Sequence, residues 1–249
     1  MADRVCVFVD GENFRHSIAN LFPDFSRADY LPSDADWGGL FNWFVQQASN
    51  DGRRIRTYWY VVEKLDPKPF RLPNPAHEPE RLKEILCRNP EIKRELSSIE
   101  DKSELGKRLI QIYSRMNSRK GIKRKRFDGW QTVHDSIAAT HPAIEFRKAG
   151  SLRHDLFDDS LGPEKAVDVK LAVDLIMLRD IYDIAVIVSG DQDYVPAVGV
   201  VKDSGKEVIN VAFKTSSGRL LPGGAARLNQ ATDWNLEIPY DELKAHLSL

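Results

Sequence analysis

Two stretches of sequence decide the fold: Val5-Cys6-Val7-Phe8-Val9-Asp10 and Ile184-Ala185-Val186-Ile187-Val188-Ser189-Gly190-Asp191. Each is a short apolar run, rich in β-branched residues, that stops at a polar turn with an aspartate. Runs that are apolar on both faces are typical of strands buried inside a parallel sheet. We therefore expect both stretches to be central, neighbouring strands whose carboxyl ends meet at one edge.

Around these strands the sequence alternates between helical and extended patterns. Further strands are expected over residues 55–62, 144–147, 207–212 and 234–238, and helices over 13–21, 37–49, 130–139, 164–179, 194–202 and 224–231. Such alternation predicts an α/β fold, with a mostly parallel sheet and helices on both faces. In sheets of this kind, ligands bind outside the carboxyl ends of the strands.

The middle of the chain interrupts this pattern. Residues 66–79 contain five prolines, which exclude regular helix and central strand, and residues 79–126 are charged and mostly helical in pattern, with Pro90 as a break. We expect one domain over residues 1–249, with a core at about 4–62 and 128–238 and a helical insertion at about 66–127. Residues 106–126 carry nine Lys or Arg and no Asp or Glu. This basic segment suits a polyanion partner, or is only a solvated helix followed by a flexible loop.

Composition narrows the class of protein. The 249 residues have a net charge of -1 and a hydrophobic content of 42%, which is ordinary for a globular protein. No apolar run approaches the roughly 18–20 residues that span a bilayer, and no signal peptide is evident. Two cysteines exclude a disulfide framework and a four-cysteine zinc site, and the six histidines show no ligand spacing. A cytoplasmic protein without membrane contact is expected.

Four aspartates are expected at the carboxyl edge of the sheet: Asp10, Asp191 and Asp193 after the two strands, and Asp168 in the first turns of a helix. Carboxylates crowded in a cleft repel one another unless protons or a divalent cation compensate them. Oxygen ligands without Cys or His favour Mg²⁺ or Mn²⁺, which bind and polarise phosphate oxygens. Each residue also has a simpler interpretation as a helix cap or an exposed acid.

Asp174 is a separate case, because its spacing places it on the apolar stripe of the helix expected over 164–179. A carboxylate there is costly unless it is hydrogen-bonded or bound to a metal. Bonds to protein groups and a metal both remain open from the sequence.

Three segments, in order, resemble the motifs of NYN domains, the LabA-like branch of the PIN-like nuclease superfamily. They are Val7-Phe8-Val9-Asp10-Gly11-Glu12-Asn13-Phe14, Lys165–Asp174 and Ile187–Pro196, and Leu228–Trp234 is similar to the family's closing segment. The resemblance covers roughly residues 4–62 and 143–238. Ala166 stands where the family often has Gly, and little consequence is expected because a helix accepts Ala readily.

The resemblance implies a PIN-like, Rossmann-like α/β fold and a metal-dependent ribonuclease. Asp10, Asp168, Asp191 and Asp193 would be the catalytic and metal-binding residues, with Mg²⁺ or Mn²⁺ as cofactor and a metal-activated water as nucleophile. Substrate binding would involve residues beside the site and in the basic segment: Asn13, Ser189, Arg119, Lys120, Lys123, Arg124, Lys125 and Arg126. Aromatic side chains such as Phe14 and Tyr194 stack on bases in this hypothesis, or belong to the core.

The leading hypothesis is thus an endoribonuclease that cleaves single-stranded or looped RNA, with a homodimer left open. The main rival is an RNA-binding or regulatory module of the same fold that uses the acidic pocket weakly or not at all. A phosphohydrolase with an aspartyl-phosphate intermediate is disfavoured, because Asp10-Gly11-Glu12 lacks a second aspartate two residues after the first.

Overall fold

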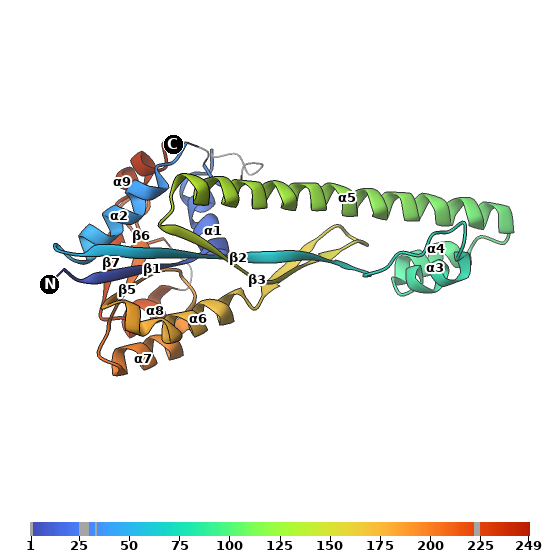
Figure 1. Ribbon diagram of the computed structural model, residues 1–249. Coiled ribbons are helices and arrows are strands. Elements are labelled where there is room, and N and C mark those ends of the chain that lie inside the picture. Colours follow the sequence, from blue (N-terminus) through green and yellow to red (C-terminus); the bar gives the residue numbers. More distant parts are fainter. Residues whose placement is uncertain (1, 25–29, 33, 222–224) are drawn as a thin grey trace. The chain divides into compact units, whose positions relative to one another are not determined.

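The computed structural model describes residues 2–24, 30–32, 34–221 and 225–249 of the chain (Figure 1). These residues form two compact units, each described below by itself. The first comprises residues 1–63, 130–150 and 166–249, and the second comprises residues 64–129 and 151–165. The turn expected at Leu221–Gly224 falls mostly on 222–224, outside the described residues.

The first unit is built on a parallel sheet. Strand β1 (Arg4–Asp10) pairs in parallel with β2 (Arg53–Lys68) and with β5 (Ile184–Val188), and the sheet continues in parallel through β6 (Glu207–Phe213) and β7 (Trp234–Ile238). The complete strand order is β4-β3-β2-β1-β5-β6-β7. The stretches Val5–Val9 and Ile184–Val188 are therefore central neighbours, as predicted, and the mixed α/β class with a mostly parallel sheet is confirmed.

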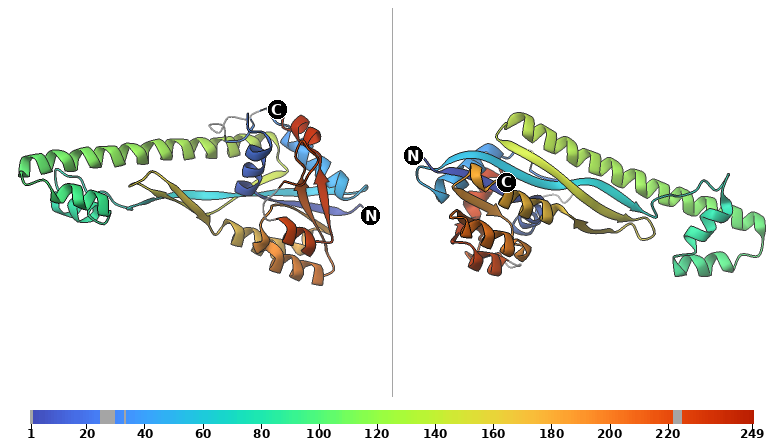
Figure 2. Two further views of the ribbon diagram at one scale, coloured as in Figure 1. Left: turned by 180° about the vertical axis from the view of Figure 1, so that it is seen from behind. Right: turned by 60° about the horizontal axis from the view of Figure 1, so that its bottom comes forward.

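Helices cover both faces of this sheet (Figure 2). On one face lie α1 (Gly11–Leu21), α2 (Trp37–Ala48) and α9 (Tyr240–His246). They pack on side chains that point from the sheet to this face, among them Val7, Val186 and Val211. On the other lie α6 (Val167–Met177), α7 (Val195–Asp203) and α8 (Ala225–Ala231), which pack on the alternate positions, such as Phe8 and Ile187. The period-two alternation of a strand thus supplies two apolar layers from one apolar run.

The second unit has its own apolar core. It contains α3 (Pro79–Leu86), α4 (Pro90–Ser97), most of α5 (Lys102–Thr140), and the antiparallel pair of β3 (Ile144–Asp155) with β4 (Leu161–Lys165). Leu82, Leu86, Leu96, Ile112 and Met116 are buried together there. Pro90 occupies the first turn of α4, where a missing N–H costs nothing, so it starts a helix.

Two expectations about the middle of the chain are wrong. The helix expected over 130–139 and the basic segment form one continuous helix, α5, so no flexible basic loop separates them. Gly106, Gly121 and Gly129 all lie within this helix, and a Cβ added at any of them would meet nothing within 4 Å. Strands β2 and β3 also extend well beyond the ranges expected, and β2 reaches past Pro67.

The helix expected over 164–179 is also different. Leu161–Lys165 is strand β4, and α6 begins only at Val167. Ala166 separates the two with a φ of 75°, a left-handed conformation. None of the helices in the described residues is long and apolar enough to span a membrane.

Candidate metal centre

The centre begins where β1 and β5 end side by side. Val9 is paired with Val188, so Asp10 and Ser189 follow as neighbours at the carboxyl edge of the sheet. Gly11 is the first residue of α1. Any side chain here would clash, because a Cβ would lie 2.4 Å from the carbonyl oxygen of Tyr60. The chain can therefore turn from β1 directly into a helix and leave the Asp10 carboxylate at the edge.

Asp10 is only 3% exposed, and three donors hold its carboxylate. The Asn13 backbone N–H donates to Oδ1 at 3.1 Å, the Ser189 hydroxyl donates to Oδ2 at 2.9 Å, and the Tyr194 hydroxyl lies 3.1 Å from Oδ2. Asp10 is thus the N-cap of α1, the simpler interpretation that the sequence left open. Capping uses one oxygen, and the other faces the site.

Asp168 lies in the first turn of α6, and its carboxylate meets that of Asp10. An oxygen of each lies within 4.8 Å of the other, and the Tyr194 hydroxyl that contacts Asp10 also lies 3.1 Å from Asp168 Oδ1. A tyrosine hydroxyl has a single proton to donate. Tyr194 therefore cannot satisfy both carboxylates when both are ionised, and one negative charge is left without a donor.

The electrostatics of the pair agree with this geometry. Burial raises the pKa of Asp10 to about 6, against the opposing effect of its hydrogen bonds, and the charge of Asp168 adds to the increase. Burial also raises the pKa of Asp168, and the charges of Asp191 and Asp193 add to it. The two carboxyl groups therefore hold protons more tightly than ordinary aspartates, as expected where negative charge has no cationic partner.

Asp191 and Asp193 lie on the turn after β5, beside this pair. The Asp191 carboxylate accepts from the Asp193 N–H at 2.9 Å and caps the short 3-10 helix η2 (Gln192–Tyr194), while Asp193 is exposed. Among the described residues, neither joins Asp10 and Asp168 in a group of oxygens all within 4.8 Å of one another. Asp193 does not cap α7, since the cap there is Tyr194 without a side-chain bond.

Asn13 and Ser189 connect the two strand ends. The Asn13 Oδ1 accepts from the Gly190 N–H at 2.9 Å, and the Ser189 hydroxyl oxygen accepts from the Asp191 N–H at 3.0 Å while it donates to Asp10. Both side chains thus fix the geometry of the acidic edge.

Asp174 has a different environment, although it is 5% exposed. Lys170 Nζ lies 2.9 Å from Oδ1, Tyr60 donates to Oδ2 at 3.1 Å, and Arg147 forms an ion pair with the same oxygen. Burial opposes ionisation, but the hydrogen bonds from Arg147 and Lys170 outweigh it and lower the pKa of Asp174. The carboxylate on the apolar stripe is therefore compensated by the protein cations Arg147 and Lys170 and by the Tyr60 hydroxyl.

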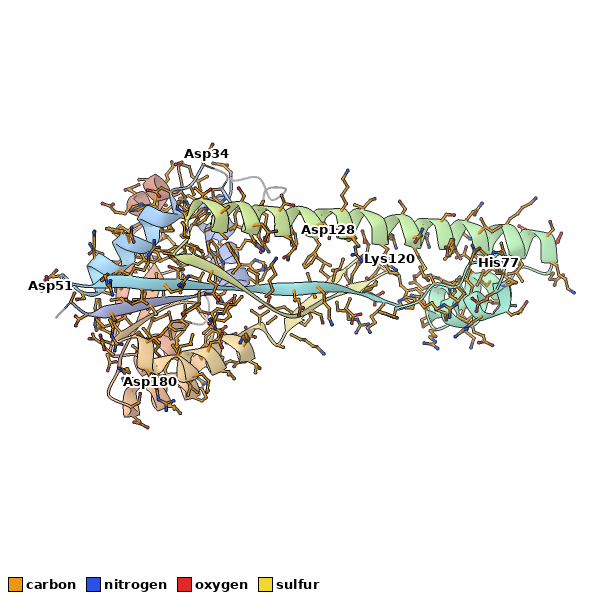
Figure 3. The ribbon with its side chains drawn as sticks, viewed as in Figure 1. Asp34, Asp51, His77, Lys120, Asp128 and Asp180 are labelled. Atoms are coloured by element: carbon orange, nitrogen blue, oxygen red, sulfur yellow. The ribbon has the colours of Figure 1, made fainter. Side chains whose placement is uncertain are left out.

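The predicted substrate-binding cations lie on α5 within the second unit, where Figure 3 labels Lys120. Arg119 donates to the backbone oxygens of Leu156 and Phe157, at 3.2 and 2.7 Å. Lys123 lies 3.9 Å from Asp159, and Arg124 lies 3.8 Å from Asp128. Lys125 and Arg126 are exposed and Lys120 is half-buried. Arg119 is thus committed to the backbone, while most of the other cations remain at the surface.

One feature of the site was missed from the sequence. Tyr194 was expected to stack on bases or to lie in the core, and its ring does lie in the core. Its buried hydroxyl, however, lies between two carboxylates, and no motif in the sequence pointed to this role. Phe14 is 1% exposed and belongs to the core.

Comparison with known proteins gives one family. The family model described as NYN domain matches residues 91–222, just over half of the chain. This range contains Asp168, Asp191 and Asp193 and starts within the segment expected to be an insertion, while Asp10 precedes it. Among solved structures, the chain resembles a crystal structure of a protein of unknown function from Vibrio parahaemolyticus RIMD 2210633, with 14% identity and a TM-score of 0.44 over 95% of this chain and 93% of that chain. No curated protein matches the chain.

Proposed function

This chain belongs to the NYN domain family, and we propose that it is a metal-dependent endoribonuclease whose metal centre is formed around Asp10 and Asp168. The family resemblance suggests a PIN-like nuclease. The single observation that most supports the proposal is the meeting of the buried Asp10 carboxylate with the half-buried Asp168 carboxylate, whose oxygens lie within 4.8 Å. The two share one tyrosine proton, and among the described residues no cationic side chain is bonded to either. The LabA-like branch remains a prediction.

The donor set fits a divalent cation. The facing groups are carboxylate oxygens, and such hard ligands favour Mg²⁺ or Mn²⁺ over zinc. Asp10 and Asp168 would hold the ion. When bound, a divalent ion supplies positive charge that stabilises the phosphate during cleavage and lowers the pKa of a water molecule.

The surrounding residues prepare the centre for such an ion. Asn13 and Ser189 orient the Asp10 carboxylate through hydrogen bonds of 3.1 and 2.9 Å, so it needs no rearrangement to act as a ligand. The Tyr194 hydroxyl donates to one of the two carboxylates and leaves an oxygen of the other free. Asp191 and Asp193 add negative potential at the same edge, and we propose that they bind a second ion or orient the attacking water.

RNA is the proposed substrate. Basic residues of α5, namely Lys120, Lys123, Arg124, Lys125 and Arg126, would contact the phosphate backbone, which is the sequence-independent part of nucleic-acid binding. Because Arg119 already donates to two backbone oxygens, we expect its contribution to be structural. Cleavage should accordingly weaken as salt concentration rises. Cytoplasmic location and a homodimer remain predictions.

Incubation of the purified chain with a mixed RNA pool tests this function, with Mg²⁺, Mn²⁺ and a chelator compared side by side. Cleavage is expected with the metals and not with the chelator, and Asp10→Asn is expected to abolish it. Asp180→Asn, which changes an exposed aspartate on the 3-10 helix η1 (Arg179–Ile181), is the matched control (Figure 3). RNA that is bound but never cut, by a folded protein in Mn²⁺, would favour the RNA-binding module instead.

A further inference from the structure

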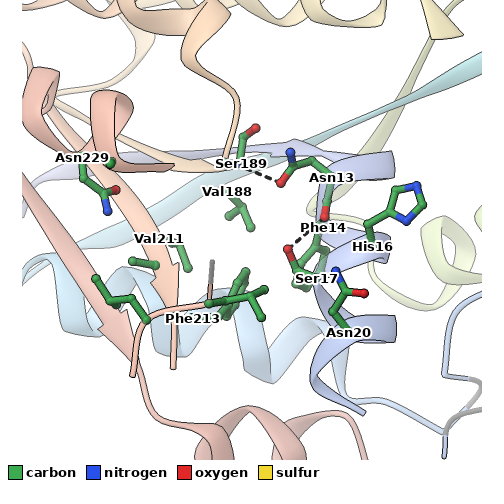
Figure 4. Close-up of a pocket in the computed structure, with 15 residues that line it drawn as sticks. Asn13, Phe14, His16, Ser17, Asn20, Val188, Ser189, Val211, Phe213 and Asn229 are labelled. Carbon is green, nitrogen blue, oxygen red and sulfur yellow. Dashed lines mark hydrogen bonds between the residues drawn. The ribbon is translucent and has the colours of Figure 1, made fainter. Parts of the chain in front are cut away.

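A pocket of about 340 Å³ opens in the first unit next to the acidic pair (Figure 4). It lies between α1, α8 and the carboxyl ends of β5 and β6. Buried Phe14, Val188, Val211 and Phe213 form its inner wall, and Phe14 and Phe213 stack on each other with ring centroids 5.6 Å apart. The volume is within the usual range for a small-ligand site and accommodates a base with its ribose.

The pocket and the acidic pair share two residues. Asn13 and Ser189 line the pocket, and the same two residues hold the Asp10 carboxylate at 3.1 and 2.9 Å. A molecule in the pocket that contacts Asn13 or Ser189 is therefore separated from the Asp10 carboxylate by a single residue. A nucleotide with its base in the pocket can extend its phosphate toward the acidic pair.

The chemistry of the lining selects a neutral, polar, planar molecule. None of the described residues that line the pocket is Lys, Arg, Asp or Glu. The exposed His16 is the one titratable side chain among them, and it already lies 3.2 Å from Glu12, so a phosphate finds little counter-charge there. Amide and hydroxyl groups of Asn13, Ser17, Asn20 and Asn229 offer donors and acceptors above an apolar wall. Amides pair well with base edges, which carry donors and acceptors side by side.

A hydrogen bond from Asn210 fixes the orientation of the Asn229 side-chain amide. Its Oδ1 accepts from Asn210 Nδ2 at 2.7 Å, and Asn210 is fully buried. Among the described residues, no hydrogen bond is formed by the Asn229 NH₂ or by the Asn13 NH₂, and both residues line the pocket. A rigid apolar wall with fixed, unsatisfied amides is the usual composition of a small-ligand site.

We propose that this pocket binds the base of the nucleotide adjacent to the cleaved phosphate and gives the enzyme a base preference, an inference that rests on the proposed nuclease function. The acidic pair acts on the phosphate, and the neutral pocket reads the base. The charged phosphate and the uncharged base of one nucleotide are thus bound at two neighbouring places, the acidic pair and the pocket.

Nucleoside binding without metal tests the pocket independently of cleavage. Adenosine, guanosine, cytidine and uridine are each added to the full chain in chelator, and binding is followed by ligand-observed NMR. At least one nucleoside should bind, and inorganic phosphate should not. Ser17→Phe, which fills the pocket from α1, should weaken that binding roughly tenfold or more. Ser136→Phe, on an exposed position of α5, is the matched control and should bind as the wild type does.

Asn20→Ala provides a second variant at the exposed rim, where the fold does not depend on the side chain. It should weaken the preferred nucleoside by a smaller factor, and sequencing of the cleavage products should show a weaker base preference beside the cut. RNA cleavage without base preference, together with no nucleoside binding by the wild type, would overturn the pocket and leave the nuclease intact. Nucleoside binding by a chain that never cuts RNA would support the pocket and overturn the nuclease.

Discussion

Asp10 and Asp174 are both buried aspartates of the same unit, 3% and 5% exposed, and their surroundings are opposite. Asp174 has Lys170 and Arg147 against its two oxygens, and its pKa is lowered. Asp10 has three hydrogen-bond donors and a second carboxylate nearby in Asp168, and no cation bonds to it in the part of the chain that the structure describes; its pKa is raised to about 6.

The comparison shows which carboxylate charge is compensated by side chains of the protein itself. Desolvating a carboxylate is costly, and removal of a buried partner usually destabilises a protein strongly. At Asp174 the sequence supplies the partners. At Asp10 and Asp168 it supplies a further carboxylate, a combination that a divalent cation would stabilise and that burial alone would not.

Replacement of Asp168 by Asn, like that of Asp10, should have a large effect on chemistry. If Asp168 is a metal ligand, metal-dependent RNA cleavage is expected to fall at least about 100-fold, because the electrostatic contribution to such a step is of that order. The rate with Mn²⁺ is compared with that of Asp174→Asn at a temperature where both variants are folded. Equal rates for Asp168→Asn and the wild type would remove Asp168 from the centre.

Replacement of Asp174 by Asn should have the largest effect on stability. It leaves Arg147 and Lys170 without their shared carboxylate, so a loss of about 3 kcal/mol in the free energy of unfolding is expected. Urea denaturation measures it. Cleavage by the folded fraction should persist, and a loss of cleavage without a loss of stability would make the comparison wrong.

Replacement of His134 tests how burial alone shifts the pKa of a side chain that has no neighbouring carboxylate pair. Its ring is 2% exposed, stacks on Phe146 with centroids 4.6 Å apart, and has no hydrogen-bond partner on either nitrogen in the described part of the chain. Burial, with a smaller effect of Lys148, lowers its pKa to about 4. The unfolded chain therefore binds a proton that the folded chain does not.

Since the folded pKa lies below the ordinary value, stability is complete above about pH 6.5 and falls as the pH drops toward 4. The loss should total roughly 2–3 kcal/mol. Urea titrations from pH 7 to pH 4 of the wild type and of His134→Phe isolate this contribution as a difference between the two curves. Parallel curves would show that His134 does not titrate as its burial implies.

Ala166→Gly should have the smallest effect. Ala166 is left-handed, with a φ of 75°, immediately before the helix that carries Asp168. Glycine relieves that strain but adds freedom to the unfolded chain, so a net gain of about 0.5–1 kcal/mol is expected in urea denaturation. The carboxylates are unchanged, so a lower stability would mean that the conformation is not strained. The premise that Ala166 lies in a helix was wrong, because Ala166 precedes α6; the small consequence expected of this alanine stays a prediction.

The central strands could be predicted because Val5–Val9 and Ile184–Val188 are apolar on both faces, a pattern typical of strands buried inside a parallel sheet. Their carboxyl ends then placed Asp10 near Ser189 and Asp191. Asp174 could be recognised as needing partners, but Arg147 and Tyr60 are distant in sequence and could not be identified.

Other features had no local signal. The basic segment was open to interpretation as a helix followed by a flexible loop where α5 is continuous, and Pro163-Glu164-Lys165 did not indicate a strand. The role of Tyr194 depends on three elements meeting, which spacing does not reveal. Long-range packing, and not local propensity, decided each of these cases.

Titration of the metal-free chain with Mn²⁺ by calorimetry tests the central claim most directly. The wild type and Asp174→Asn are expected to bind Mn²⁺ with similar affinity, and Asp168→Asn is expected to bind it at least about tenfold more weakly. If the wild type binds no Mn²⁺, or if Asp168→Asn binds it as well as the wild type does, the uncompensated pair of Asp10 and Asp168 is not a metal centre.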